Sequence, residues 1–170
     1  MCKAVRVFVC LSLCSHGRCR HGSRCVGNDV GDWTFQVNGC RELGITVLAF
    51  SPLAMGRLSG HYDPWGHAPT WTDRGKSRAR PFGSTLDADP DAWHQLLRML
   101  RQMAQKYGKT CAQVAINWVL CQGAVAICGA RSGEQAAENA GAMGWRLSAE
   151  DALLLGALGA RGETSDFQHG

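Results

Sequence analysis

The chain has 170 residues, a formal net charge of +4, 45% hydrophobic residues and 19% charged residues. This balance is that of a globular protein that can bury a core, and it excludes a chain that is disordered throughout. The basic excess is too small and too local to indicate a nucleic-acid partner, and no apolar run approaches the roughly 18 residues of a membrane span.

Residues 1–38 are rich in Cys and Arg and show no sustained periodicity, so we leave them unassigned as an irregular leader that is either disordered or a targeting segment. A cytoplasmic location is expected, with organellar targeting by this leader as the alternative. The odd total of nine cysteines does not indicate a disulfide framework. A zinc site in the leader is disfavoured because its cysteines and histidines lack paired Cys-x-x-Cys spacing. The candidate ligands are Cys10, Cys14, His16, Cys19, His21 and Cys25.

Ordered patterns begin near Gly39. Residues 45–50 form a short β-branched and apolar run that Ser51 and Pro52 stop, which predicts a central parallel strand buried on both faces. Residues 59–90 contain Gly, Pro, Asp and Trp without a regular period, which predicts a long loop.

Four helices and a second strand are expected after this loop. Asp89 and Pro90 are typical of a helix start, and leucines at helical spacing continue to Tyr107. Thr110 and Gln113 have the spacing of a capping box for a second helix. The apolar run 124–128 predicts another strand. Two further helices are predicted by the cap spacings of Ser132 with Gln135 and of Ser148 with Asp151. This order of elements is that of an α/β protein with parallel strands.

The two predicted strands end in residues that suit a ligand. Gly129 would let a ligand approach the backbone, and Ser132 would begin a helix whose free N–H groups favour anions. Arg131 adds a guanidinium group that can bind an anion through two N–H groups. Such a site would suit a phosphate at the carboxyl ends of parallel strands. The alternative is that Gly129 only turns the chain and Arg131 is solvated, and spacing alone favours this alternative slightly.

A family resemblance changes this weighting. Residues 40–60 resemble the seventh strand and following loop of aldo-keto reductases. Residues 112–118, 127–131 and 134–139 resemble, in the family's order, a later helix, the eighth strand and the adenine-phosphate helix. The resemblance implies a partial TIM (β/α)₈ barrel with its C-terminal strands and helices only, because a complete barrel needs about 250 residues. Residues 39–160 would form this half-domain, and residues 161–170 a tail.

The resemblance also implies an NADP(H) site. Arg131 would favour the 2′-phosphate of NADP(H) over NAD(H). One departure is Cys128, where many relatives carry proline. The implied cofactor-binding residues are Ser51, Pro52, Leu53, Gly56, Leu58, Gly129, Ala130, Arg131, Gln135, Glu138 and Asn139.

The implied function is reduction of aldehydes or ketones by hydride transfer, with a small-molecule carbonyl substrate. The family's catalytic tyrosine, lysine, aspartate and histidine come from the earlier half of the barrel, and no segment here matches them. Tyr62 and Tyr107 are interpreted as packing or surface residues. The chain is therefore expected to be a truncated form that needs a partner chain to complete the barrel. The alternative is a non-catalytic NADP(H)-binding or interaction module.

Overall fold

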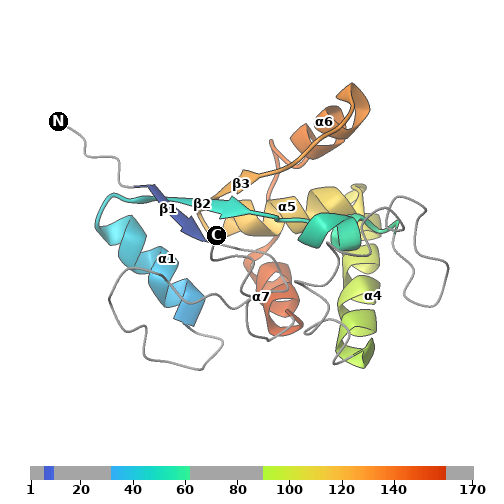
Figure 1. Cartoon of the computed structure of the whole chain (residues 1–170). Helices are drawn as coiled ribbons and strands as arrows, with labels where there is room; N and C mark the ends of the chain where they lie inside the picture. Colours follow the sequence, from blue (N-terminus) through green and yellow to red (C-terminus); the bar gives the residue numbers. More distant parts are fainter. Residues whose placement is uncertain (1–5, 10–31, 62–89, 160–170) are drawn as a thin grey trace.

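A computed structural model describes residues 6–9, 32–61 and 90–159 of the chain, which form a parallel sheet with helices packed against it (Figure 1). The sheet has the order β1-β2-β3. In chain order the elements are β1 (Arg6–Val9), α1 (Asp32–Glu42), β2 (Thr46–Phe50), the 3₁₀ helix η1 (Ala54–Ser59), α4 (Pro90–Tyr107), α5 (Cys111–Cys121), β3 (Val125–Ile127), α6 (Gly133–Ala140) and α7 (Ala149–Ala157).

The prediction of a central parallel strand at residues 45–50 is confirmed. β2 pairs in parallel with β1 on one side and with β3 on the other. The register pairs Leu48 with Val125 and Phe50 with Ile127, so the carboxyl ends of β2 and β3 lie side by side.

Only one face of this sheet is covered by the described residues. On one face of β2, Val47 and Ala49 are 2% and 0% exposed, whereas Leu48 and Phe50 on the other face are only half-buried. Their β3 partners on that second face, Val125 and Ile127, are 49% and 44% exposed. The expectation of a strand buried on both faces is therefore wrong for the part of the chain that the structure describes. The apolar run correctly indicates a strand with two apolar faces, but in a (β/α)₈ barrel the second face meets side chains of other strands.

The helix caps follow the sequence signals closely. The Thr110 side chain accepts from the Gln113 backbone N–H, and the Gln113 side chain accepts from the Thr110 N–H, which completes the expected capping box of α5. Ser132 and Ser148 cap α6 and α7 in the expected way. The predicted cap Asp89 lies outside the described residues, and α4 begins at Pro90.

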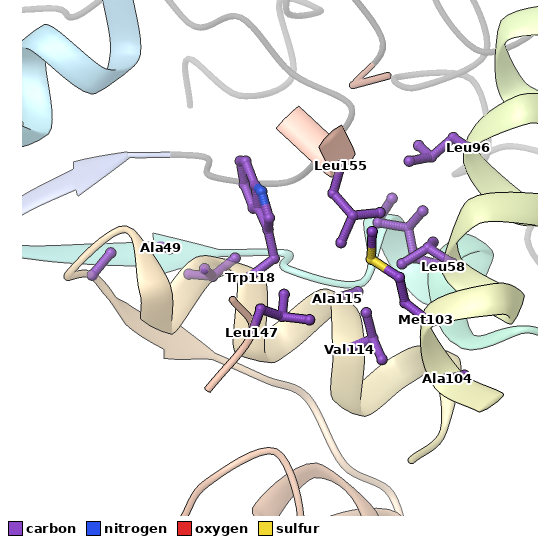
Figure 2. Packing of buried hydrophobic residues seen from close by; sticks show 14 of the residues in the cluster. Ala49, Leu58, Leu96, Met103, Ala104, Val114, Ala115, Trp118, Leu147 and Leu155 are labelled. Atoms are coloured by element: carbon purple, nitrogen blue, oxygen red, sulfur yellow. The ribbon is translucent and has the colours of Figure 1, made fainter. Parts of the chain in front are cut away.

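The hydrophobic core lies between α4, α5, α7 and η1. Leu155 of α7, Leu96 of α4 and Leu58 of η1 are all 0% exposed, and Figure 2 shows them together with Met103 around the same space. α5 contributes seven buried residues and contacts η1, α4, α6, α7 and β3. This helix is therefore the centre of the described structure.

The expectation that residues 1–38 form an irregular leader is wrong at two places. Residues 6–9 form β1, and α1 begins at Asp32, before the predicted boundary. The sequence of α1 contains Thr, Asn and Gly and lacks a clear apolar stripe, so the helix depends on tertiary contacts. One of these is the hydrogen bond from Arg41 Nη2 to the Gln122 carbonyl, which joins α1 to the end of α5. Residues 1–5, 10–31, 62–89 and 160–170 are not described, and they include the leader cysteines and Tyr62.

Candidate functional site

Two loops meet at one edge of the sheet. The first follows β2 and begins at Ser51, and the second follows β3 and contains Gly129, Ala130 and Arg131. Because Phe50 is paired with Ile127, the two loops leave adjacent strands at the same level. The sequence therefore placed both groups of candidate residues at the edge where parallel α/β sheets bind their ligands.

The loop after β2 has an unusual backbone. Ser51 and Ala54 adopt left-handed conformations with φ of 53° and 48°, and Gly56 has φ of 92°. Left-handed backbone costs a non-glycine residue about 1 kcal/mol or more and is enriched at ligand sites. The loop is closed by hydrogen bonds from Ala54 N to Ser51 O (2.9 Å) and from Gly56 N to Leu53 O (2.9 Å).

The side chains of this loop divide into two groups. Ser51, Leu53 and Gly56 are half-buried and have part of their surface open. Pro52 is buried, and Leu58 is 0% exposed within the hydrophobic core. The side chains of Pro52 and Leu58 therefore pack inside the protein, and only their backbone is left for a direct ligand contact.

The loop after β3 is exposed and is held by two candidate residues. Gln135 Oε1 accepts from Arg131 N at 2.7 Å, and Asn139 Nδ2 donates to Gly129 O at 3.3 Å. The Gln135 side chain thereby binds the backbone N–H of Arg131, while the backbone N–H of Gln135 donates to the Ser132 hydroxyl. Gln135 and Asn139 thus fix the loop against α6.

This loop offers a positive charge beside open space. Among the described residues, no side chain or carbonyl hydrogen-bonds or ion-pairs with the guanidinium of Arg131, which is exposed and immediately precedes the N-cap of α6. A Cβ added at Gly129 would meet nothing within 4 Å. Free helix N–H groups and a guanidinium attract the same kind of ligand, an anion such as a phosphate.

Cys128 stands between β3 and this loop. Burial raises the pKa of its thiol, so the side chain is neutral at physiological pH. It is half-buried and acts here as a small apolar residue at the strand exit.

A tyrosine, a lysine and an aspartate also meet in the structure, but on helices α4 and α7. The Tyr107 hydroxyl donates to Asp151 Oδ2 and accepts from Ser148 N at 3.0 Å, and Lys106 Nζ lies 2.8 Å from the same carboxylate oxygen. The Lys106 and Tyr107 hydrogen bonds lower the pKa of Asp151. The Tyr107 hydroxyl is engaged as donor and as acceptor, so this group joins α4 to α7.

Sequence reasoning missed the α5 side chains that hold α6 and the segment that follows it. Gln113 Nε2 donates to the Glu138 carbonyl at 3.0 Å. Asn117 is 0% exposed, donates to the carbonyls of Ala142 and Trp145, and accepts from Leu147 N at 3.0 Å. The available signal was an asparagine within the apolar face of α5, since a buried amide must find partners.

Two negative findings apply to residues 6–9, 32–61 and 90–159. Within them, no group of three or more His, Cys, Asp or Glu side chains could hold a metal ion. No helix in these ranges is both long enough and apolar enough to cross a membrane.

Two curated relatives resemble this chain over more than half of its length. Pyridoxal reductase, chloroplastic, from Arabidopsis thaliana is 39% identical over 116 residues, which are 68% of this chain and 29% of the relative. L-glyceraldehyde 3-phosphate reductase from Escherichia coli K12 is 34% identical over 102 residues, 59% of this chain and 29% of the relative.

A solved structure supports the fold. The glycerol dehydrogenase of Gluconobacter oxydans superposes with a TM-score of 0.59 at 22% identity, over 72% of this chain and 36% of that structure. At this identity the likeness concerns the α/β barrel-type fold alone. The chain thus spans only 29% to 36% of the length of these relatives.

The profile of the Aldo/keto reductase family matches residues 37–158, which are most of the chain and include both loops of the candidate site. The chain therefore belongs to the aldo/keto reductase family.

Proposed function

We propose that this chain provides the phosphate- and adenosine-binding part of an NADP(H) site in an oxidoreductase that reduces aldehydes or ketones. The observation that carries the proposal is the meeting of the two loops at adjacent strand ends, with the Arg131 guanidinium beside open space at the start of α6. A dinucleotide has anionic groups along its length, and both loops could contact it from one edge of the sheet.

The individual roles follow from exposure. Ser51, Leu53 and Gly56 would line the pyrophosphate, with Pro52 and Leu58 supporting the loop from the core. Gly129 and Ala130 would admit the adenosine end, and the planar fork of Arg131 would bind the 2′-phosphate in a bidentate manner. Gln135, Glu138 and Asn139 would form the helical wall of this subsite. The bound nicotinamide would supply or accept the hydride.

Carbonyl reduction is proposed for the whole protein. This chain spans about a third of the length of its relatives. The names pyridoxal reductase and L-glyceraldehyde 3-phosphate reductase support a small carbonyl compound as substrate. Further parallel strands would have to cover Val125 and Ile127, which supports completion of the barrel by another segment or a partner chain.

The second candidate is a non-catalytic NADP(H)-binding or interaction module. It is favoured by Tyr107, because this tyrosine is committed to a contact between α4 and α7. Reductase assays with common aldehydes separate the two candidates. Binding of NADPH without its oxidation supports the module, and turnover supports the enzyme.

Arg131→Ala tests the proposed cofactor. We expect this change to weaken NADPH binding by about ten- to a hundredfold, through loss of a charge-assisted bidentate contact, and to leave NADH binding nearly unchanged. Affinities are measured by quenching of tryptophan fluorescence. Arg98→Ala removes an exposed arginine from α4 and serves as the matched control. Equal weakening for both nucleotides would contradict a 2′-phosphate role.

The cellular location depends on the leader. The Arabidopsis relative is chloroplastic by its name, which supports the organellar alternative over the cytoplasmic one. Fluorescent fusions with and without residues 1–38 decide between them: a change of compartment on removal of the leader supports targeting, and an unchanged cytoplasmic signal contradicts it.

A further inference from the structure

Helix α6 carries Glu138 and Asn139, yet it has no buried residue. In Figure 1 it stands apart from the layer formed by α4, α5 and α7. Hydrophobic packing therefore contributes little to its orientation. Two hydrogen bonds from α5 side chains hold the end of this segment: Gln113 binds the Glu138 carbonyl of α6, and Asn117 binds the carbonyl of Ala142 just after the helix.

Gln113 makes the contact that reaches α6 itself, and both ends of its side-chain amide are engaged. Gln113 Oε1 accepts from Thr110 N at 3.1 Å and belongs to the capping box of α5. Gln113 Nε2 donates to the Glu138 carbonyl at 3.0 Å. The cap fixes the orientation of the amide, because its oxygen is already bound on one side, and so directs the NH₂ group toward α6.

A glycine on α6 leaves room for this contact. Gly141 has φ of −64°, an ordinary helical value that any residue adopts. A Cβ at this position would overlap Gln113 Nε2 and come within 3.2 Å of the Glu138 carbonyl oxygen. A side chain at this position would therefore displace the Gln113 amide, whereas the backbone conformation of Gly141 would accept any residue.

We propose that Gln113 is a positioning residue for the adenosine subsite, acting through the Glu138 carbonyl. The inference rests on the proposed NADP(H) function. The Glu138 carbonyl adjoins Asn139, whose side chain in turn holds the Gly129 carbonyl at 3.3 Å. A continuous set of contacts thus joins the cap of α5 to the loop that presents Arg131. Displacement of α6 would move this loop relative to the loop after β2.

Three variants separate this role from helix capping. Gln113→Glu retains an oxygen for the Thr110 N–H but presents an acceptor to the Glu138 carbonyl, so the cap survives and the bridge is lost. Gly141→Ala displaces the Gln113 amide from the other side. Thr110→Ala is the control, because it removes the hydroxyl of the cap and leaves the bridge in place.

The probes are NADPH and adenosine 2′,5′-bisphosphate, with amide hydrogen exchange of α6 as a readout that needs no ligand. For Gln113→Glu and Gly141→Ala we expect both probes to bind about five- to tenfold more weakly and α6 to exchange faster. For Thr110→Ala we expect lower stability with unchanged affinities. In the double variant Gln113→Ala/Gly141→Ala the added methyl group no longer meets the Gln113 amide, so Gly141→Ala should weaken binding less in the Gln113→Ala background than in wild type.

Two kinds of failure are distinguishable. Wild-type protein that binds neither probe contradicts the proposed function, and the exchange of α6 still tests whether Gln113 fixes the helix. Wild-type binding with equal affinities in Gln113→Glu and Gly141→Ala overturns the positioning role alone. Weaker binding in Thr110→Ala of the same size as in Gln113→Glu also overturns it, because helix capping would then explain both results.

Discussion

Helices α5 and α6 follow each other closely in the chain but are held by different forces. α5 has seven buried residues and contacts most other elements. α6 has no buried residue and relies on hydrogen bonds with α5 and with the loop that joins it to β3. The stability of the fold should therefore depend on α5 and its neighbours, while the geometry of the proposed phosphate site should depend on polar contacts that contribute little to the free energy of unfolding.

The largest effect on stability is expected from a large-to-small substitution in the hydrophobic core. Leu155→Ala removes a side chain that is 0% exposed and packs with α4 and η1. We expect a loss of about 3 kcal/mol in the free energy of unfolding, from lost burial and the remaining cavity. Urea unfolding followed by far-UV circular dichroism measures it. Leu153→Ala, at a position 74% exposed on the same helix, is the control and should change stability by less than about 0.5 kcal/mol.

An intermediate effect is expected at the contact between α4 and α7. Tyr107→Phe removes the donor to Asp151 and the acceptor for Ser148 N, and should cost about 1–2 kcal/mol at neutral pH. Thermal unfolding compared with wild type is the measurement. Unchanged stability would mean that water replaces the hydroxyl at no cost.

The same contact predicts a pH dependence. The Lys106 and Tyr107 hydrogen bonds lower the pKa of Asp151 below its unfolded value of about 3.9. Its contribution to stability is therefore complete above that value and is lost as the pH falls through the folded pKa. We expect the stability of wild type to fall more steeply than that of Asp151→Asn as the pH is lowered below ~4. Parallel curves for the two proteins would show that this carboxylate is not responsible for the acid dependence.

The smallest effects are expected when the same substitution, Ser→Ala, is made at the N-caps of α6 and α7. Ser132 and Ser148 each cap a helix by accepting an N–H three residues ahead. Ser148→Ala should lower global stability by about 1 kcal/mol because α7 belongs to the core. Ser132→Ala should speed amide exchange in α6 and leave the unfolding midpoint nearly unchanged. Equal shifts in the midpoint would show that α6 unfolds with the core.

Prediction from sequence succeeded where one local signal dominates. Thr110 with Gln113 and the leucines of α4 were sufficient to place helices, and residues 45–50 were sufficient for a central strand. It failed for α1, whose polar sequence becomes helical through contacts such as that of Arg41 with the end of α5. The bridge from Gln113 to Glu138 joins residues 25 positions apart, and no local pattern specifies such a contact.

For the candidate site, the sequence and the family resemblance proposed which residues gather at the strand ends but not how they are engaged. Gln135 and Asn139 hold the backbone of the second loop, and Leu58 lies in the core. Amide side chains can reach a ligand or the protein's own backbone equally well, and only the fold decides between these partners.

The backbone of Ser51 and Ala54 also determines which substitutions the first loop tolerates. Both residues have φ near +50°, a region that β-branched side chains disfavour strongly and that glycine, asparagine and aspartate enter most easily. Ala54 is also 0% exposed, so a larger side chain there would meet the core as well. A saturation library at these two positions, selected for folded protein, should therefore lose valine, isoleucine and threonine first. Among the variants that remain, abundance should follow the preference of each residue for left-handed backbone more closely than its polarity.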